Sequence, residues 1–355
     1  MKVLHFDFAG GFRGGQKQAL LLHKGLLDRG VESHFLVTSE SKLLEITRHE
    51  NVDNIHSVKK ESWGPPILRR LLSFRSVKQT IAQIQPDILH FHEPGSVIYG
   101  ALFSEYLSCE TRRVSSPIRN RSVRYKYRKI DVHVGVSDYV SAILRDKKLA
   151  NVHTIPSSIE LARFQAVVPK ELKGRRQFNF LYLGSMSEMK GIDILLKAFA
   201  GLCQDRSDVT LHLVGSGPKC DDYLHMTETL GISDRTEFYS FITDVERYYP
   251  AVDLVIVPSR HGEGSNGVIK EALASGKPVL VSDFPPNLEL VNDGTNGIVF
   301  ENENVSDLLI KLKLFLEQKY RIDPAIARRS VERFSSDNMV DSYLRLYQSM
   351  IAGIA

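Results

Sequence analysis

Cysteine is scarce in this sequence. The 355 residues include only Cys109, Cys203 and Cys220, whose spacing matches neither a CxxC pair nor a set of metal ligands. A long apolar run is missing as well, because His5 and Asp7 interrupt the opening residues MKVLHFDFAGG and make them too short and too polar for a signal peptide or a membrane span. These absences predict a cytoplasmic protein in a reducing compartment, with cysteines that serve as packing residues.

Charge is small in sum but uneven along the chain. The net charge is +4, yet residues 119–129 (RNRSVRYKYRK) contain six basic residues, no acid and the interleaved Tyr125 and Tyr127. Two explanations fit such a run equally well: a solvated helix face, or a patch that contacts an anionic surface. Because homeodomain, zinc-finger and RNP signatures are absent from the sequence, we expect no nucleic acid partner and favour an anionic membrane surface.

Apolar runs of strand length alternate with segments of helical spacing over most of the chain. Strands are predicted at 2–8, 32–39, 87–92, 132–137, 152–157, 178–185, 209–217, 236–242, 253–259 and 277–283, and helices at 15–30, 77–85, 192–203 and 267–276. This alternation indicates an α/β protein with mostly parallel, doubly wound sheets.

A polar stretch at 168–177 (VPKELKGRRQ) separates two such series and is the candidate linker. We therefore predict an N-terminal Rossmann-like domain at 1–167 and a C-terminal Rossmann-like domain at 168–335. The final residues, 336–355, are predicted to form a helix that packs back on the N-terminal domain.

In doubly wound sheets, ligands bind beyond the carboxyl ends of the strands, so the strand-to-helix turns are the places to inspect. The first turn is glycine-rich and ends at Gly14 and Gly15. Glycines let the backbone approach a ligand closely and let helix amides face an anion. The pattern GGxxGG differs from GxGxxG, however, and plain turn chemistry explains it nearly as well.

Residues 258–279 (PSRHGEGSNGVIKEALASGKPV) carry a sharper pattern, in which Glu263 and Glu271 stand eight positions apart across a strand–loop–helix junction. Residues 265–267 lie where the helix should begin, so free amides and the positive helix end can face a diphosphate. Glu271 can accept hydrogen bonds from ribose hydroxyls and Glu263 from a sugar beyond the phosphates. The alternative is an exposed loop acid beside an ordinary acid at a helix start.

Five segments in their expected order resemble the retaining glycosyltransferases of family 4. They are GGFRGGQKQ, DILHFHEP, VHTIPSSIELARF, VTLHLVGSGP and the 258–279 segment, which resembles the family's E-x7-E motif. The resemblance implies the GT-B fold, in which two doubly wound Rossmann-like domains face each other across a deep cleft.

The resemblance also implies roles for individual residues. His92, Lys190 and Glu263 would be catalytic, without an enzyme nucleophile, and the donor phosphate itself would take the acceptor proton. For His92 the alternative is a satisfied histidine at the end of a buried strand; we expect His90 to be buried and His92 to lie exposed on the opposite face. The residues implied in donor binding are Gly14, Gly15, Gly184, Ser185, Ile242, Asp244, Ser265, Asn266, Gly267, Val268 and Glu271, with no metal and no cofactor. One departure is Ser185, which occupies the position of a phosphate-binding arginine in the family segment GRLxxxKG; Arg13 or Arg260 could substitute.

The implied activity is retaining transfer of a hexose-type sugar from a nucleotide diphosphate sugar to a glycan or lipid-linked acceptor. The basic segment and Arg69, Arg70 and Arg75 suggest an anionic acceptor such as a bacterial envelope glycan or lipopolysaccharide, and a location at the inner face of the cytoplasmic membrane. The alternative is a non-catalytic nucleotide-sugar-binding protein, because the missing arginine is a lesion typical of an inactive relative.

Overall fold

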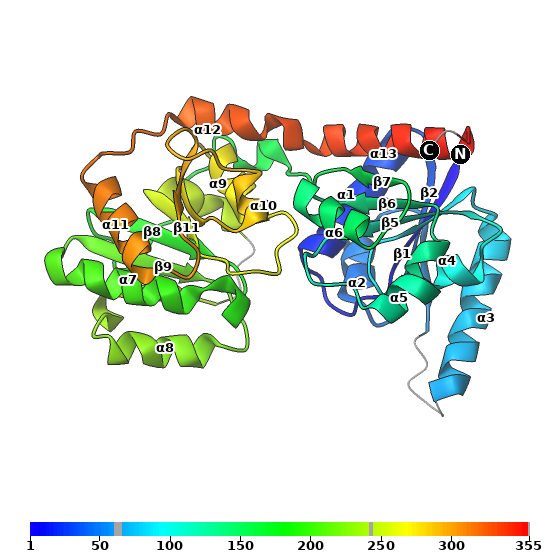
Figure 1. Cartoon of the computed structure of the whole chain (residues 1–355), viewed down its shortest axis with the longest axis horizontal. Helices are drawn as coiled ribbons and strands as arrows, with labels where there is room; N and C mark the ends of the chain where they lie inside the picture. The colour runs from blue at the N-terminus through cyan, green and yellow to red at the C-terminus, as the bar shows by residue number, and fades with distance from the viewer. Residues whose placement is uncertain (60–65, 241–243, 354–355) are drawn as a thin grey trace. The chain divides into compact units, whose positions relative to one another are not determined.

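The computed structural model describes residues 1–59, 66–240 and 244–353, with the backbone alone for residues 66–73. Its described residues form two compact units, each built around one parallel sheet. Residues 1–158 and 336–355 make up the first unit, and residues 159–335 make up the second (Figure 1).

The first unit contains a seven-stranded sheet in the order β3-β2-β1-β4-β5-β6-β7. Its strands are β1 (Lys2–Asp7), β2 (Glu32–Thr38), β3 (Ile55–Val58), β4 (Ile88–Phe91), β5 (Leu107–Arg112), β6 (Val132–Gly135) and β7 (Val152–Thr154). Its helices are α1 (Gly14–Asp28), α2 (Lys42–His49), α3 (Pro66–Ile84), α4 (Ile98–Leu102), α5 (Asn120–Tyr125), α6 (Asp138–Asp146) and α13 (Ser336–Ile351). The order reverses between β1 and β4, which is the point where such sheets bind ligands.

The second unit contains a six-stranded parallel sheet in the order β10-β9-β8-β11-β12-β13. Its strands are β8 (Phe178–Leu183), β9 (Val209–Val214), β10 (Thr236–Tyr239), β11 (Leu254–Val257), β12 (Val279–Ser282) and β13 (Gly297–Phe300). Its helices are α7 (Ile192–Asp205), α8 (Cys220–Thr229), α9 (Gly267–Ala274), α10 (Pro285–Leu288), α11 (Val305–Leu316) and α12 (Pro324–Val331).

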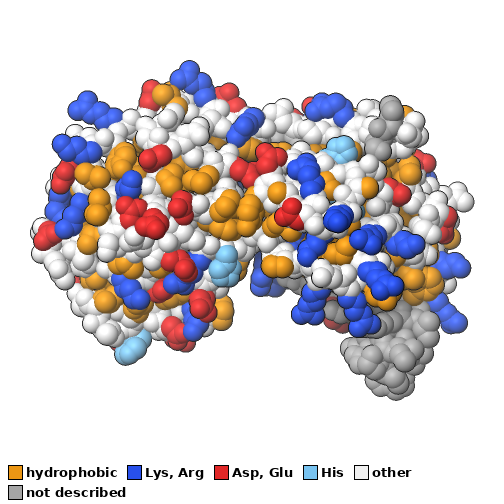
Figure 2. All heavy atoms as spheres, in the orientation of Figure 1, with side chains coloured by type: hydrophobic (Ala, Val, Ile, Leu, Met, Phe, Trp, Pro, Cys, Tyr) orange, Lys and Arg blue, Asp and Glu red, His pale blue; other side chains and the backbone are white. Residues whose placement is uncertain are grey.

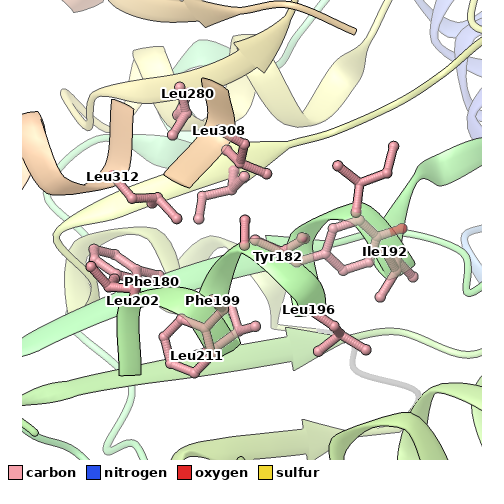
Figure 3. Close-up of a cluster of buried hydrophobic side chains, with 14 of the residues drawn as sticks. Phe180, Tyr182, Ile192, Leu196, Phe199, Leu202, Leu211, Leu280, Leu308 and Leu312 are labelled. Atoms are coloured by element: carbon pink, nitrogen blue, oxygen red, sulfur yellow. The ribbon is translucent and has the colours of Figure 1, made fainter. Parts of the chain in front are cut away.

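Alternate residues of the second sheet enter two different cores. Phe180 and Leu211 face α7, α8 and α11, together with the buried side chains drawn in Figure 3. Leu181 and Val255 point the other way and pack against α9 and α12. Because successive side chains of a strand point to opposite faces, a sheet covered on both sides needs continuous apolar runs, as the sequences of β11 and β12 provide.

The sequence predicted most of the described strands, but of the helices only α1, part of α3, α7, α9 and α13. Three strands, β3, β5 and β13, were missed, and β5 is the most instructive because its sequence LSCETR has no apolar run. Glu110, Thr111 and Arg112 are nonetheless buried. Their burial depends on polar partners from other elements, which a window of sequence does not contain.

The division between the units falls at Ser158 and Ile159, nine residues before the boundary predicted from the polar stretch. Ile159 and Phe164 are buried in the core on the α9 side of the second sheet, which ties this segment to the second unit. At the other end, α13 packs on α1 through the buried Tyr343 and Tyr347 and belongs to the first unit. Among the described residues, helices long and apolar enough to span a bilayer are absent.

Candidate functional site

Lys190 and Glu263 form an ion pair at the carboxyl edge of the second sheet, from loops that follow β8 and β11. Their side chains are 19% and 16% exposed, so both remain partly accessible to solvent. Gly191 makes the approach of the two loops possible: its φ is 68°, and a Cβ atom there would lie 2.0 Å from the carbonyl oxygen of Pro258. The fold therefore brings together two residues that the sequence predicted for the site.

Helix α9 begins where the sequence predicted, with Asn266 as its N-cap and Gly267 as its first residue. The Asn266 side chain accepts a hydrogen bond of 3.1 Å from the Val268 amide, so that amide already has a partner. Ser265 is held by the buried Lys270, whose Nζ donates a 2.7 Å hydrogen bond to its Oγ. The helix end keeps its positive dipole, because the first turn contains no acid.

Glu271 lies in the second turn of α9, as predicted, and one of its carboxylate oxygens is fixed. The hydroxyl of the fully buried Tyr249 donates a 2.5 Å hydrogen bond to Oε2. A Cβ atom built on Gly267 would lie 3.8 Å from Oε1, so the other oxygen is directed toward the N-terminal end of the helix. This arrangement leaves one fixed acceptor for a ligand hydroxyl.

Gly184 and Ser185 follow β8 directly. Ser185 is exposed, its backbone carbonyl accepts a 2.8 Å hydrogen bond from the Tyr182 hydroxyl, and its own hydroxyl lies 3.3 Å from that of Ser187. The position is thus a well-anchored turn that presents a short neutral side chain in place of a cation.

Of the two arginines proposed to replace the missing one, Arg260 is already paired with acids and Arg13 belongs to the first unit. Arg260 forms ion pairs of 2.6 Å with Asp193 and 2.9 Å with Glu303, which neutralise its charge. Arg13 belongs to the first unit, where it is exposed and is the N-cap residue of α1. Lys190 is therefore the cation that the described part of the second unit offers beside Glu263.

The segment predicted to contact a nucleobase is described only in part. Ile242 lies outside the described residues. Asp244 is described and accepts hydrogen bonds from Lys170 Nζ at 3.0 Å and Arg247 Nη1 at 3.4 Å. The hydrogen bond from Lys170 lowers the pKa of Asp244, which is therefore a paired carboxylate.

In the first unit, His92 is buried directly after β4. The prediction that His90 and His92 occupy opposite faces, with His92 exposed, was wrong: their relative exposures are 0% and 4%, and their ring centroids lie 4.0 Å apart. Successive side chains of a strand point to opposite faces, so residues two positions apart share a face, and alternation itself places His90 and His92 together.

A chain of hydrogen bonds assigns the tautomers of two of these histidines. Arg113 Nη2 lies 3.2 Å from Nδ1 of His92, and since a guanidinium only donates, Nδ1 must accept. A neutral His92 then carries its proton on Nε2, which donates across 2.9 Å to Nδ1 of His5. Burial lowers the pKa of His92 and of His5 well below 6.5, which keeps both rings neutral.

Three buried histidines are close enough to hold a metal ion: His5, His90 and His92. Their hydrogen bonds point to a different use. His90 engages both ring nitrogens, with the hydroxyl of Tyr347 at 2.6 Å and that of Thr111 at 2.7 Å. A divalent cation would also be repelled by the guanidinium of Arg113. The cluster is therefore better described as a polar network that orients His92.

The glycine-rich turn of the first unit leads into α1, whose first residues are Gly14 and Gly15. Arg13 caps this helix without a side-chain hydrogen bond, and its backbone amide donates to Gln16 Oε1 at 3.2 Å. The first turn of α1 contains no acid. Helix amides without intrahelical partners thus lie at the carboxyl edge of the first sheet.

Sequence reasoning missed three residues that organise these sites: Tyr249, Lys270 and Arg113. Each lies beside a predicted feature, yet none has a spacing signal of its own. Tyr249 and Arg113 lie outside the predicted strands and helices, and Lys270 falls inside the helix predicted at 267–276.

Two family models match the chain, one on each half. The model described as Glycosyltransferase Family 4 matches residues 12–163, and the model described as Glycosyl transferases group 1 matches residues 164–332. Together with the two parallel-sheet units, these matches show the class: the chain belongs to the family 4-like glycosyltransferases of the GT-B type.

Individual relatives have low sequence identity, and the share of this chain that they match differs widely. An uncharacterized glycosyltransferase of Haemophilus influenzae is 29% identical over 44% of this chain, which spans only 45% of that protein. A phosphatidyl-myo-inositol mannosyltransferase of Mycolicibacterium smegmatis is 24% identical over 97% of this chain and 92% of its own length. The crystal structure of Anabaena HepE with UDP-glucose has a TM-score of 0.83 at 19% identity, covering 98% of this chain and all of that one, and supports the fold.

Proposed function

We propose that this glycosyltransferase transfers a hexose-type sugar, with retention of configuration and without a metal ion, from a nucleoside diphosphate sugar to a glycan or lipid-linked acceptor of the cell envelope. The observation that carries the proposal is the pairing of Lys190 with Glu263 beside the helix that holds Glu271. A cation, two carboxylates and a helix N-terminus are the groups that a diphosphate, a ribose and a hexose need.

Each group has a distinct role in this proposal. Glu271, with Oε2 held by Tyr249, accepts from the ribose hydroxyls through Oε1. The diphosphate draws Lys190 away from Glu263, which frees Glu263 to accept from hydroxyls of the hexose. Because the pair neutralises itself when no donor is bound, neither charge is left without a partner in the resting state.

The chemical step needs no nucleophile from the protein. The bond between C1 of the sugar and the phosphate oxygen breaks, the acceptor oxygen bonds to C1 from the same face, and the acceptor proton passes to the departing phosphate. Negative charge grows on the diphosphate during this step, and Lys190 with the end of α9 stabilises it. His92 takes the role of a positioning residue, because burial keeps it neutral and Arg113 and His5 engage both ring nitrogens.

A basic surface on the first unit supports an anionic acceptor or membrane. The first unit has 25 Lys and Arg against 17 Asp and Glu, whereas the second has 21 against 25. In the segment 119–129, Val123 and Tyr127 are buried anchors, so the basic side chains between them face solvent (Figure 2). Tyr125 is 58% exposed, with Arg124 over its ring at 5.5 Å. Such an aromatic and basic surface suits the headgroup region at the inner face of the cytoplasmic membrane.

The first experiment is a calorimetric screen of UDP, GDP and ADP and their common hexose conjugates, with and without EDTA. One nucleotide should bind, insensitive to EDTA, and Glu271→Ala should weaken that binding by about tenfold or more, since ribose hydroxyls lose a charged acceptor. The transfer reaction is then run with an extract that contains acceptors, and NMR of the product gives the anomeric configuration of the transferred sugar. An inverted product, or a requirement for a divalent ion, would refute the proposed mechanism.

A second function is favoured by one observation. With Ser185 at the turn and Arg260 neutralised by two acids, the site holds fewer cations than its family pattern implies, as a non-catalytic nucleotide-sugar-binding protein would. Incubation with the bound donor separates the two: release of free sugar or transfer to an acceptor establishes an enzyme. Tight binding of the donor with neither reaction supports the binding protein.

A further inference from the structure

The C-terminal helix α13, drawn in red in Figure 1, carries two tyrosines on the face that it buries in the first unit. Tyr343 and Tyr347 lie about one helical turn apart, and they are 1% and 0% exposed. The other buried residues of this face are apolar: Met339, Val340, Leu346 and Met350. Apolar contacts can dock such a helix by themselves, whereas two buried hydroxyls need hydrogen-bond partners of their own.

The partners of these hydroxyls lie on β4 and β5. The Tyr347 hydroxyl is 2.6 Å from Nδ1 of His90, and Nε2 of the same ring is 2.7 Å from Oγ1 of Thr111. That threonine oxygen is in turn 2.8 Å from the Tyr343 hydroxyl. All four side chains are buried. One continuous series of hydrogen bonds therefore joins α13 to two adjacent strands of the first sheet.

The direction of these bonds follows from the need to satisfy each buried group. Burial raises the pKa of Tyr347, so its hydroxyl keeps its proton, and within the described part of the chain His90 is its one hydrogen-bond partner. A buried hydroxyl without an acceptor is costly, so Tyr347 donates to Nδ1 of His90. Burial lowers the pKa of His90 well below 6.5. The ring is therefore neutral, carries its proton on Nε2 and donates it to Thr111.

His90 is also a ring against which His92 packs, with 4.0 Å between the two ring centroids. Hydrogen bonds to Arg113 and His5 hold both ring nitrogens of His92. Such bonds oppose a tilt about the line through the two nitrogens least, because both donor–acceptor distances are kept during the tilt. The contact with His90 opposes this motion directly. Since packed interiors transmit displacements, a rotation of His90 would move the ring of His92.

We propose that Tyr347 is a positioning residue for sugar transfer, because it fixes the rotamer and the tautomer of His90 and, through this ring, the orientation of His92. The role in transfer rests on the proposed function, in which His92 positions the substrate; the coupling of the three side chains does not. The last helix of the chain then contributes to the site, although Tyr347 acts on a substrate only through His92.

The position of the network supports a role beyond packing. Four buried polar groups carry a desolvation cost that an apolar core at the same place would avoid. In return, a fully satisfied buried network specifies one arrangement of its side chains. Strand β4 borders the point where the strand order of the first sheet reverses, which is where such sheets bind ligands. The network therefore fixes ring orientations at the edge of the sheet where a substrate would use them.

The test combines transfer kinetics with NMR of the ring nitrogens of His92 in the full chain. Tyr347→Phe should shift the His92 resonances and lower kcat about tenfold or more, since a small misplacement of a positioning group is costly. Its affinity for the nucleoside diphosphate should equal that of the wild type, because Glu271 and Lys190 belong to the second unit. Wild-type His92 resonances or a wild-type kcat in Tyr347→Phe would overturn the proposal.

Met350→Ala is the matched control for looser packing of α13. Met350 is buried on the same face of the helix but lies outside the hydrogen-bonded series. Its truncation leaves a cavity and should lower thermal stability at least as much as Tyr347→Phe does. The control should nonetheless keep the wild-type kcat and the wild-type His92 resonances. An equal loss of kcat in the two variants would assign the effect to helix docking and overturn the positioning role.

A second variant keeps the test valid if Tyr347→Phe does not fold. Thr111→Val has a similar shape and removes the acceptor of His90 Nε2, so it disturbs the same ring from its other nitrogen. It should also shift the His92 resonances, and unchanged resonances would overturn the coupling. The NMR measurement needs no activity. If the wild-type protein transfers no sugar, the proposed function fails, while the His92 resonances still show whether α13 orients that ring.

Discussion

The hydroxyl of Tyr249 donates a hydrogen bond of 2.5 Å to Oε2 of Glu271. Tyr249 precedes β11 and is fully buried, whereas Glu271 lies in the second turn of α9. Burial and the adjacent carboxylate raise the pKa of Tyr249, so its hydroxyl stays protonated and donates throughout the neutral range. One buried side chain thus fixes the rotamer of the carboxylate that we assign to the ribose.

Tyr249→Phe should weaken nucleoside diphosphate binding by about three- to tenfold, since Glu271 loses its orienting donor and must be ordered when the ligand binds. Calorimetry with the nucleotide found in the screen measures the change. Tyr248→Phe is the matched control, because Tyr248 is a buried neighbour whose ring lies near Lys170 instead. Equal affinities for the two variants would show that the hydrogen bond has no role in binding.

Lys190→Ala should lower turnover by about 10- to 1000-fold, because one preorganised cation facing the departing diphosphate is removed. Initial rates at saturating donor measure this. The control is Lys197→Ala, an exposed lysine on α7 outside the site, which should keep wild-type rates. Near wild-type turnover in Lys190→Ala would move charge stabilisation to another residue.

Ser185→Arg restores the cation that the family pattern carries at this turn, and it should raise turnover or donor affinity by about tenfold. The side chain is exposed, so an arginine can be accommodated without repacking the core. Measurement of kcat and KM separately shows which quantity gains. Unchanged values for both would mean that the diphosphate does not pass near this turn.

Replacing Arg121, Arg124 and Arg128 by glutamine should reduce binding to vesicles that contain phosphatidylglycerol, by about tenfold at low salt. Raising the ionic strength should erase the difference between variant and wild type, since these side chains are exposed and screened. The control replaces three exposed basic residues of the second unit: Lys319, Arg321 and Arg329. Equal losses for both triple variants would indicate net charge alone, without a specific surface.

Stability should fall on mild acidification, because burial lowers the pKa of several histidines; that of His23 falls to about 4 and that of His212 to about 4. Above about pH 6.5 both folded and unfolded chains hold these rings neutral. Below that value the unfolded chain takes up protons first, so the free energy of unfolding decreases as pH falls toward about 4. Each such histidine contributes up to about 1.4 kcal/mol per pH unit.

Urea unfolding at pH 7.5, 6.0 and 5.0 measures this dependence. His23→Gln should lower stability at pH 7.5 but flatten its decline with acid, since one proton-binding difference is gone. His225→Gln is the control, because that side chain is 81% exposed. A slope in His23→Gln equal to that of the wild type would show that His23 is not among the groups responsible.

Much of the architecture is local and was readable from the sequence. Apolar runs such as LVIV and VLVS predict buried parallel strands, and Asn266 followed by Gly267 marks the start of α9. The order of the family segments then indicated the fold and the class of enzyme. These inferences succeed because strand periodicity, caps and motif spacing are properties of neighbouring residues.

The contacts inside the sites were decided only by the tertiary structure. Lys190 and Glu263 are 73 residues apart and meet because β8 and β11 are adjacent strands. Likewise, adjacency of β4 and β5 places Arg113 beside His92. Strand order and the burial of a charge depend on packing summed over a whole domain, and the pairing of side chains across a sheet edge leaves no periodic trace along the chain.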